Sequence, residues 1–214
     1  MTKPQNKPNK TNVTKTVIIA MLAAVATVLQ YLEFPIPVIM PSFLQMDLSD
    51  LPELIGAFAV GPVGGVLICL IKNVIHLAVS KSGYVGELAN FLLGAVLSLA
   101  AGLIYRAKKT KKGALLACVA GTALMAAMSV PINYFIVYPV YIKIMGHENV
   151  LRFYTDILPG SDTLLKSLVI FNVPFTLIKG VLVSILAMLI YKPLSRMFVK
   201  MNNSFAGKRK NEDG

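Results

Sequence analysis

The sequence predicts an all-α integral membrane protein whose chain forms a bundle of six transmembrane helices. The first observation is composition, because 56% of the 214 residues are hydrophobic and only 14% are charged, whereas soluble domains average about 45–50% and about 25%. The second is that the apolar residues form long runs separated by short polar segments. The third is that basic residues gather beside these runs, which is typical of a multi-pass membrane protein.

Basic residues set the orientation of the predicted helices. Fifteen of the 21 lysines and arginines lie before residue 16, within residues 106–112 or after residue 191. Cytoplasmic loops of membrane proteins carry such an excess, so we expect all three segments, and with them both termini, on the cytoplasmic side. This placement explains the net charge of +11 without nucleic-acid binding.

The N-terminal part combines a polar segment with the first apolar run. Residues 1–15 are rich in Asn, Lys and Thr, which predicts a disordered cytoplasmic tail. The first helix is expected at about Thr16 to Leu32. The residues Ala24 to Ala26, "AVA", loosely fit a signal-peptidase site, but the apolar run continues beyond them and further spans follow. We therefore favour an uncleaved helix.

The next segment, residues 33–53, contains four prolines and four acidic residues but no basic residue, which predicts an outer loop. A connection of this length is often a lid or a binding loop. Residues 54–79 have the length of one span, but "GPVGG", at 61–65, interrupts them, because proline lacks a backbone donor and glycine frees the backbone. We expect two short helices here, since the number of spans between two cytoplasmic segments must be even.

Three further helices complete the predicted bundle, at about Glu87–Tyr105, Ala114–Ile144 and Leu164–Tyr191. A short interfacial helix is expected in the outer loop between the last two. The membrane domain then covers residues 16–195, and residues 196–214 form a basic cytoplasmic tail.

Small residues recur at four-residue spacing in two of the predicted helices. Ala20 and Ala24 form one pair, and Gly94, Ser98 and Gly102 form a longer series. Such spacing allows two helices to approach closely. We favour packing inside the bundle over a surface for a partner.

Ionisable side chains inside membrane helices are candidates for function. Lys72 lies close enough to the outer end of its helix to snorkel partly to the surface, and Glu87 lies near the outer end of the fourth helix. Lys179, in contrast, lies near the middle of its span. A charge at that depth costs about 2.5–3.5 kcal/mol on insertion scales, so an interaction must offset it. Asn172 and Thr176 share a helical face with Lys179.

Together with Asn90 and Asn133, these side chains predict a polar pocket in the outer half of the bundle, roofed by the first loop. The alternative is that these groups only hydrogen-bond one another, with Lys179 paired to Glu87. Asn offers a donor and an acceptor, and Lys offers donors, which suits a flat heterocycle that carries carbonyls and ring nitrogens. Aromatic side chains on the outer side are candidates to stack on it: Phe43, Tyr84, Phe91 and Tyr134.

Enzyme motifs are missing from the sequence. "HENVL" at His147 starts like a zinc-protease motif but lacks the second histidine, and there is no GxxxxGK[ST] phosphate loop. Cys69 and Cys118 both lie in apolar runs, where we expect packing residues rather than a disulfide or a metal site. We therefore predict a non-enzymatic protein that holds no cofactor and does not use ATP itself.

Several stretches, in this order, resemble a known family. They are "LEFPIPVIMPSFLQMDLSDLPEL", "FAVGPVGGVLICLIKNVIH", "VGELANFLLG", "MSVPINYFIVYPVY" and "PFTLIKG". The chain resembles, over about residues 16–195, the substrate-binding S components of energy-coupling factor (ECF) vitamin transporters, and most closely the riboflavin-specific ones.

This resemblance implies a six-helix bundle in the cell membrane of a bacterium, of Gram-positive origin, that binds riboflavin at its outer side beneath the first loop. In the family, the residues matching Asn133 and Lys179 contact the flavin, and the helix face matching Ala20 and Ala24 docks on a coupling subunit driven by two cytoplasmic ATPases. The candidate binding residues are then Leu44, Met46, Asp47, Glu87, Asn90, Asn133, Asn172, Thr176 and Lys179.

Two positions depart from the pattern of the family. Thr176 stands where the family motif P-F-N-x-I-K-G has asparagine, and Gln45 stands where the first loop of the family often has lysine, two residues before Asp47. Asn172, one turn before Thr176, is a candidate to supply the missing amide. The ligand is therefore left open between riboflavin, FMN and a related flavin.

Three other readings remain as alternatives. The same fold could bind another vitamin, such as thiamine or a pterin. An intramembrane enzyme of lipid or polyprenol chemistry is disfavoured because metal-binding carboxylate pairs are absent from the sequence. A membrane scaffold without a ligand is disfavoured by the buried lysine and asparagine set.

Overall fold

The computed structural model describes residues 10–36, 40–41, 44–80 and 83–210. Within these residues, five helical segments are long and apolar enough to cross a membrane. They are Val13–Tyr31, Pro62–Val79, Val85–Ala107, Lys111–Met145 and Leu164–Tyr191. Four of them agree closely with the predicted first, fourth, fifth and sixth helices.

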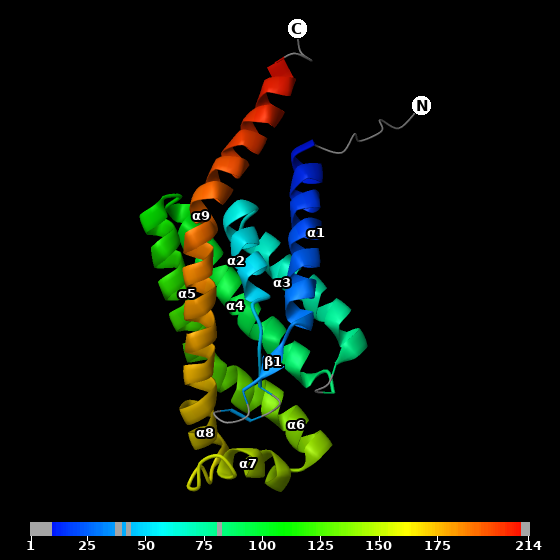
Figure 1. The fold of residues 1–214 in the computed structure, drawn as a ribbon, viewed down its shortest axis with the longest axis vertical. Coiled ribbons are helices and arrows are strands. Elements are labelled where there is room, and N and C mark those ends of the chain that lie inside the picture. Colours follow the sequence, from blue (N-terminus) through cyan, green and yellow to red (C-terminus); the bar gives the residue numbers. More distant parts are fainter. Residues whose placement is uncertain (1–9, 37–39, 42–43, 81–82, 211–214) are drawn as a thin grey trace, which may run out of the picture.

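The first helix, α1 (Lys10–Tyr31), begins six residues before the predicted start at Thr16. Part of the predicted N-terminal tail is therefore helical, and residues 1–9 lie outside the described residues. Figure 1 shows α1 roughly parallel to the long axis of the molecule.

The predicted break at residues 61–65 is confirmed, because α2 (Asp50–Ala59) and α3 (Pro62–His76) are separate helices. Gly61 makes the turn with φ +102°, a conformation that glycine adopts without strain. Pro62 then starts α3, where its missing N–H costs no hydrogen bond. A short 3₁₀ turn, η1 (Leu77–Val79), extends α3.

The length of α2 differs from the prediction. Its ten residues rise about 15 Å, half of the roughly 30 Å of a bilayer core, so α2 is not among the five membrane-length helices. It also starts at Asp50, so the prediction that the loop extends to residue 53 is wrong. Carboxylates favour a helix N-terminus, and proline is tolerated in a first turn, so the acidic, proline-containing segment starts a helix. α2 packs against α1, α3, α4 and α9 (Figure 1).

Small residues let α4 (Val85–Ala107) approach its neighbours. Gly94, Ser98 and Gly102 are all buried. A Cβ atom at Gly102 would lie 2.7 Å from the Cα of Pro62, closer than side chains pack. The prediction that this series serves internal packing is confirmed. The same prediction is wrong for Ala20 and Ala24, which are exposed on α1.

The two remaining membrane-length segments each contain a stretch of π-helix. α5 (Lys111–Ile132) continues through η2 (Asn133–Val137) into α6 (Tyr138–Met145). After the short α7 (His147–Thr155), α8 (Leu164–Ser167) continues through η3 (Leu168–Asn172) into α9 (Val173–Lys210). The short helix expected in this outer loop is thus α7.

Prolines explain the position of both π-helical stretches. Pro139 and Pro174 each follow a π-helix by two residues. Proline has no N–H, and its ring crowds the carbonyl four residues earlier. For Pro139 this is the carbonyl of Phe135, and for Pro174 it is the carbonyl of Ile170. Both lie in the middle of a π-helix, whose wider turn relieves the crowding. Such stretches are frequent at functional sites, and Asn133 begins η2 while Asn172 ends η3.

Exposed lysines lie at the end of the bundle that holds both chain ends. In Figure 1 the start of α1, the end of α9 and the α4–α5 connection lie at one end, and α6, α7 and α8 lie at the other. Lys108, Lys109, Lys111 and Lys112 are exposed in the α4–α5 connection. The segments that the sequence assigns to one membrane face therefore lie at one end of the molecule.

Candidate functional site

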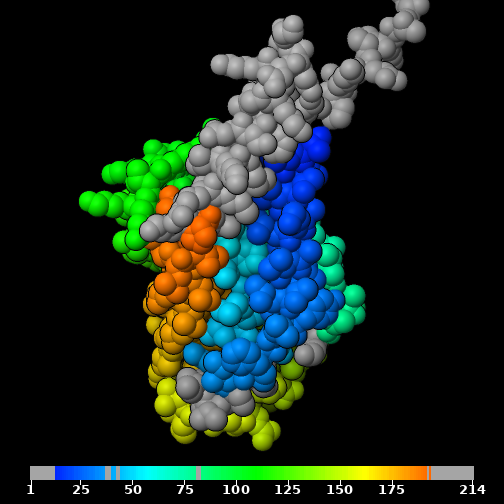
Figure 2. Space-filling model, turned by 45° about the horizontal axis from the view of Figure 1, so that its top comes forward, coloured from blue at the N-terminus to red at the C-terminus, as the bar shows by residue number. Residues whose placement is uncertain are grey.

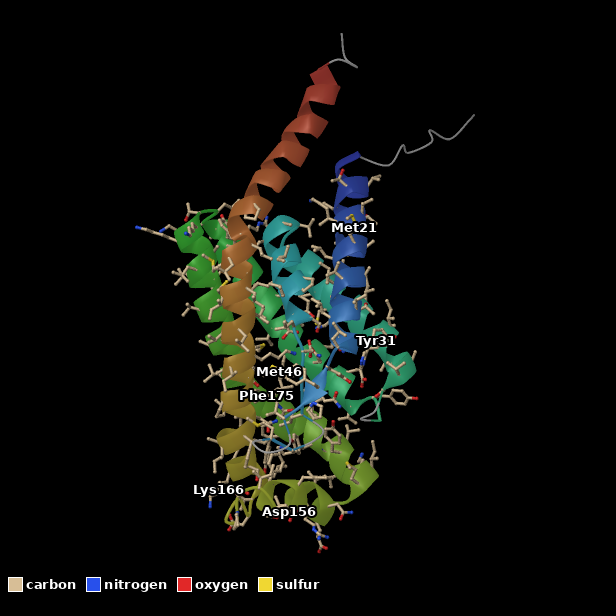
Figure 3. All side chains as sticks on the ribbon, in the orientation of Figure 1. Met21, Tyr31, Met46, Asp156, Lys166 and Phe175 are labelled. Atoms are coloured by element: carbon tan, nitrogen blue, oxygen red, sulfur yellow. The ribbon has the colours of Figure 1, made fainter. Side chains whose placement is uncertain are left out.

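The first loop folds back on itself over the middle of the bundle. β1 (Phe34–Pro35) pairs antiparallel with β2 (Gln45–Met46), with Phe34 opposite Met46. Figure 3 shows Met46 and Phe175 of α9 on the half of the bundle that lies away from the chain ends. This hairpin brings the residues after β2 against α4 and α9.

A pocket lies beneath this loop, with about 920 Å³ of space between atoms, part of it open to solvent. Eight of the nine candidate residues line it: Leu44, Asp47, Glu87, Asn90, Asn133, Asn172, Thr176 and Lys179. Met46 does not line it and is instead buried in a hydrophobic cluster with Val85 of α4, Ile132 of α5 and Phe171 of η3.

Lys179 is 9% exposed and is held by two carboxylates. Its Nζ lies 3.0 Å from Oδ2 of Asp47 and 3.1 Å from Oδ2 of Asp50. Asp47 belongs to the loop and Asp50 begins α2, so the ammonium ties both to α9. The alternative in which Lys179 pairs with Glu87 is wrong.

Lys72 is the second buried cation of the same cluster. It is fully buried, so the prediction that it snorkels to the surface is wrong. Its Nζ lies 3.0 Å from Asp50 and 2.5 Å from Oε1 of Glu53, and it also donates to Oγ of Ser49. Two ammonium groups thus face three carboxylates in the interior of the bundle.

Asp47 is held in its ionised form by this cluster. Burial alone would raise its pKa, but the ammonium groups of Lys179 and Lys72, together with hydrogen bonds from Ser49, outweigh burial and hold the pKa well below its ordinary value. Asn90 joins the same network, since its Nδ2 donates to Oδ2 of Asp47 over 3.5 Å and its Oδ1 accepts from Lys72 over 3.4 Å.

The two asparagines at the π-helices present opposite groups to the pocket. Nδ2 of Asn133 donates to the carbonyl of Ser129 over 2.7 Å, and Oδ1 of Asn172 accepts from the hydroxyl of Tyr154 over 3.0 Å. Asn133 therefore has its oxygen, and Asn172 its NH₂ group, for a ligand. Thr176 follows on the same face and is 5% exposed.

Glu87 takes part in a different group of contacts. The Nδ1–H of His76 donates to Oε1 of Glu87 over 2.9 Å, and the hydroxyl of Ser80 donates to Oε2 over 2.8 Å. Glu33 lies 3.7 Å from Nε2 of His76. His76, Glu87 and Glu33 line the pocket beside Gln30.

The aromatic residues beside the pocket are not those that the sequence suggested. Tyr84 is 64% exposed and Tyr134 is 38% exposed, neither they nor Phe91 line the pocket, and Phe43 lies outside the described residues. The rings that line it are Tyr138 and Tyr141 of α6 and Phe175 of α9. The sequence did indicate these rings, because they lie in "YPVY" and "PFTLIKG", the stretches that contain the two prolines that follow the π-helices.

Sequence reasoning also missed the role of several charged and polar residues. Asp50 and Glu53 were assigned to the loop, and Gln30, Glu33 and His76 were not assigned to the site. Two lysines at depth require buried counter-ions, and the first loop holds four acidic residues without a basic one. That imbalance was the signal for Asp50 and Glu53.

Membrane-length helices around a pocket of buried amides and charged groups define an integral membrane protein that binds a small polar molecule. The family model described as "ECF transporter, substrate-specific component" matches residues 14–191. The chain belongs to this family of transporter S components.

Two curated relatives and one solved structure are similar to this chain over most of their length. The chain is 34% identical over 185 residues to riboflavin transporter RibU of Staphylococcus aureus (strain TCH60), covering 86% of this chain and 92% of that protein. It is 32% identical to riboflavin transporter FmnP of Bacillus subtilis (strain 168), covering 84% and 90%. The structure, described as the S component of a bacterial ECF transporter, has a TM-score of 0.69 and 32% identity and covers 87% of this chain and 98% of that chain.

Proposed function

We propose that this protein is the riboflavin-binding S component of an ECF transporter and mediates riboflavin uptake across the cell membrane. The observation that carries the proposal is the pocket beneath the first loop, where Asn133, Asn172 and Lys179 meet aromatic side chains. Relatives that are named riboflavin transporters at 34% and 32% identity support flavin as the ligand.

The chemistry of the pocket fits an isoalloxazine ring. The ring carries carbonyl oxygens and nitrogens that act as acceptors and one N–H that acts as a donor. The NH₂ group of Asn172 and the ammonium of Lys179 match the acceptors, and Oδ1 of Asn133 matches the N–H. Phe175 and Tyr138 offer aromatic surface to the flat ring.

The binding roles of the loop residues are part of this proposal. Leu44 and Asp47 close the pocket from the loop side, and Met46 supports the loop from the hydrophobic cluster. Thr176 is shorter than the asparagine of the family motif and contributes a hydroxyl. Asn172 then supplies the amide.

The proposed topology has six membrane helices with both termini in the cytoplasm. α2 would be the sixth helix. It would cross part of the bilayer, and the loop before it would complete the crossing. The sequence has no GxxxxGK[ST] phosphate loop, so we propose that a coupling membrane subunit and two cytoplasmic ATPases energise transport. Ala20 and Ala24 are exposed on α1, and Figure 2 shows α1, in blue, on the surface of the bundle; this face would dock on the coupling subunit.

Fluorescence of riboflavin tests the ligand. The purified protein is expected to quench riboflavin at micromolar concentration, and Asn133→Leu should weaken binding about tenfold or more, because a buried partner group loses its hydrogen bond. Asn149→Leu is the matched control, since Asn149 is exposed on α7. If riboflavin and FMN are not quenched by the wild type, the proposal is overturned.

Co-purification tests the docking face. Ala20→Leu with Ala24→Leu should abolish capture of the coupling subunit and leave riboflavin binding intact. Ala123→Leu with Ala127→Leu is the control, because these alanines have the same spacing and are exposed on α5. Equal capture by both double variants would refute docking through α1.

A further inference from the structure

The buried charge cluster contains one more carboxyl group than ammonium groups. Asp47, Asp50 and Glu53 supply the carboxyl groups, and Lys72 and Lys179 supply the ammonium groups. The exposed fractions of these side chains do not exceed 11%. If all five groups were ionised, one negative charge would stay uncompensated in the interior, and proteins avoid such a charge by neutralising the group. The cluster therefore requires one further positive charge.

Two of the carboxyl groups, those of Asp47 and Asp50, have the hydrogen-bond donors that ionised carboxylates need. Asp47 accepts from the backbone N–H and the hydroxyl of Ser49, and Nζ of Lys179 lies 3.0 Å from its Oδ2. Asp50 faces both lysines, with Oδ1 3.0 Å from Lys72 and Oδ2 3.1 Å from Lys179. Such donors favour the ionised form of a carboxyl group, so these two groups are not the place for an extra proton.

Glu53 has a different environment. Its side chain is 0% exposed, and Nζ of Lys72 lies 2.5 Å from Oε1. Oε2, in contrast, has no hydrogen-bond partner among the residues that the structure describes. It lies against the backbone of α4, since a Cβ atom at Gly94 would be 2.7 Å from it. Buried polar atoms are nearly always paired, and an ionised oxygen that meets no donor is especially costly, so a proton on Oε2 removes that cost.

The groups that surround Glu53 do not supply the missing charge. Among the described residues, the other ionisable side chains of the cluster come from the loop, α2, α3 and α9, and they are Asp47, Asp50, Cys69, Lys72 and Lys179. The helices α1 and α4, which also pack against α2, add none to these. Lys72 is the cation that contacts Glu53, but it also donates to Asp50 over 3.0 Å, so its charge is shared between two carboxyl groups.

We propose that Glu53 is a proton-binding site, which carries a proton on Oε2 at neutral pH and makes the buried cluster electrically neutral. A metal cation fits this position less well. The ammonium of Lys72 already lies beside Oε1, and the α4 backbone at Gly94 lies against Oε2. A proton needs no such space.

The proton on Glu53 also balances the charges beside the ligand pocket. Asp47, Asp50 and Lys179 line the pocket, whereas Glu53 does not. With Glu53 neutral, Lys179 balances Asp47 and Lys72 balances Asp50. The site goes beyond the proposed function, because it does not depend on which ligand the pocket binds.

Infrared spectroscopy of the purified full chain at pH 7 detects the proton directly, in a detergent without ester or carboxyl groups. The C=O stretch of a protonated carboxyl group absorbs at higher frequency than ionised carboxylates and amides do. We expect this band in the wild type and its loss in Glu53→Gln, whereas Glu148→Gln, at an exposed site on α7, should keep it. A wild-type spectrum without the band, or a band that Glu53→Gln retains, overturns the proposal.

Thermal unfolding at pH 7 gives a second test through isosteric variants. Glu53→Gln keeps the carbonyl that faces Lys72 and places an NH₂ group at the position of the acid OH, so its Tm should fall by no more than about 4 °C. Asp50→Asn is the matched control, because it neutralises a carboxylate that contacts both lysines, and its Tm should fall by roughly 6–20 °C. If Glu53→Gln loses as much as Asp50→Asn, Glu53 is ionised and the proposal is wrong.

Exchange of the salt separates a proton from a bound metal ion. The Tm of the wild type should stay the same when sodium and potassium chloride are replaced by choline chloride at equal ionic strength. A Tm that falls without sodium or potassium would assign the missing charge to a metal cation and overturn the proton site.

Discussion

Replacing Lys179 tests whether the buried charge cluster stabilises the folded bundle in addition to contributing to ligand binding. Lys179→Met removes the partner of Asp47 and Asp50, whose side chains are 2% and 3% exposed. Two unit charges 3 Å apart attract by about 5 kcal/mol at an effective dielectric constant of about 20. Desolvation offsets part of this, and removing one partner of a buried pair costs about 3–5 kcal/mol, a large share of the roughly 5–15 kcal/mol that stabilises a domain.

A double variant separates charge balance from the loss of the side chain. Asp47→Asn added to Lys179→Met removes one negative charge, so the excess of carboxylates over ammonium groups returns to that of the wild type. We expect the double variant to regain at least half of the lost stability. Riboflavin affinity should stay low in both variants, because Lys179 also faces the ligand.

Thermal unfolding in detergent, followed with a thiol-reactive dye, measures the effect. Cys69 and Cys118 are buried and free, so they react when the bundle opens. Lys179→Met should lower the Tm by roughly 6–20 °C, at about 2–4 °C per kcal/mol. A Tm within 2 °C of the wild type, or a double variant no more stable than the single one, would refute the assigned ion pairs; Lys166→Met, at an exposed site on α8 (Figure 3), is the control.

Three further predictions concern other contacts. Tyr154→Phe should weaken riboflavin binding about fivefold to tenfold in the quenching assay, because Asn172 loses the donor that orients its amide, and an unchanged affinity would contradict this. Gly180→Ala should cost about 1–3 kcal/mol, since its Cβ would lie 2.6 Å from Thr122; a wild-type Tm would show that α5 and α9 can separate there. Because the pKa of Asp47 is lowered in the folded protein, its stabilising contribution is complete above the unfolded value of about 3.9 and is lost only as the pH falls further. The Tm difference between the wild type and Asp47→Asn should therefore be the same at pH 7 and pH 5, and a smaller difference at pH 5 would contradict the pairing.

The membrane-length helices could be predicted because the bilayer imposes a simple rule on sequence. An apolar run must be about 20 residues long to cross it, and glycine with proline ends a run visibly, as at Gly61 and Pro62. The rule fails for α2, because a helix that is buried among other helices needs neither the length nor the uniform apolar character of a span.

Much of the pocket could be predicted for a related reason. Asn133, Asn172 and Lys179 stand out because polar residues are rare within apolar runs. Since a polar group in a membrane needs a partner, each of them indicates a site. Gln30 and His76 were not recognised, since each lies at the end of an apolar run, where polar residues are common. Only their three-dimensional neighbours, Asn73 for Gln30 and Glu87 for His76, distinguish them from ordinary helix ends.

The pairing of the lysines depends on the position of the N-terminus of α2. Because α2 is short, its first turn lies inside the bundle rather than at a membrane face, and a helix N-terminus favours carboxylates there. Asp50 and Glu53 occupy that turn, and negative charge there is tolerated only with cations nearby. Lys72 from α3 and Lys179 from α9 supply them. Lys179 is therefore stabilised inside the bundle by the buried N-terminus of a helix that is too short to span a bilayer by itself.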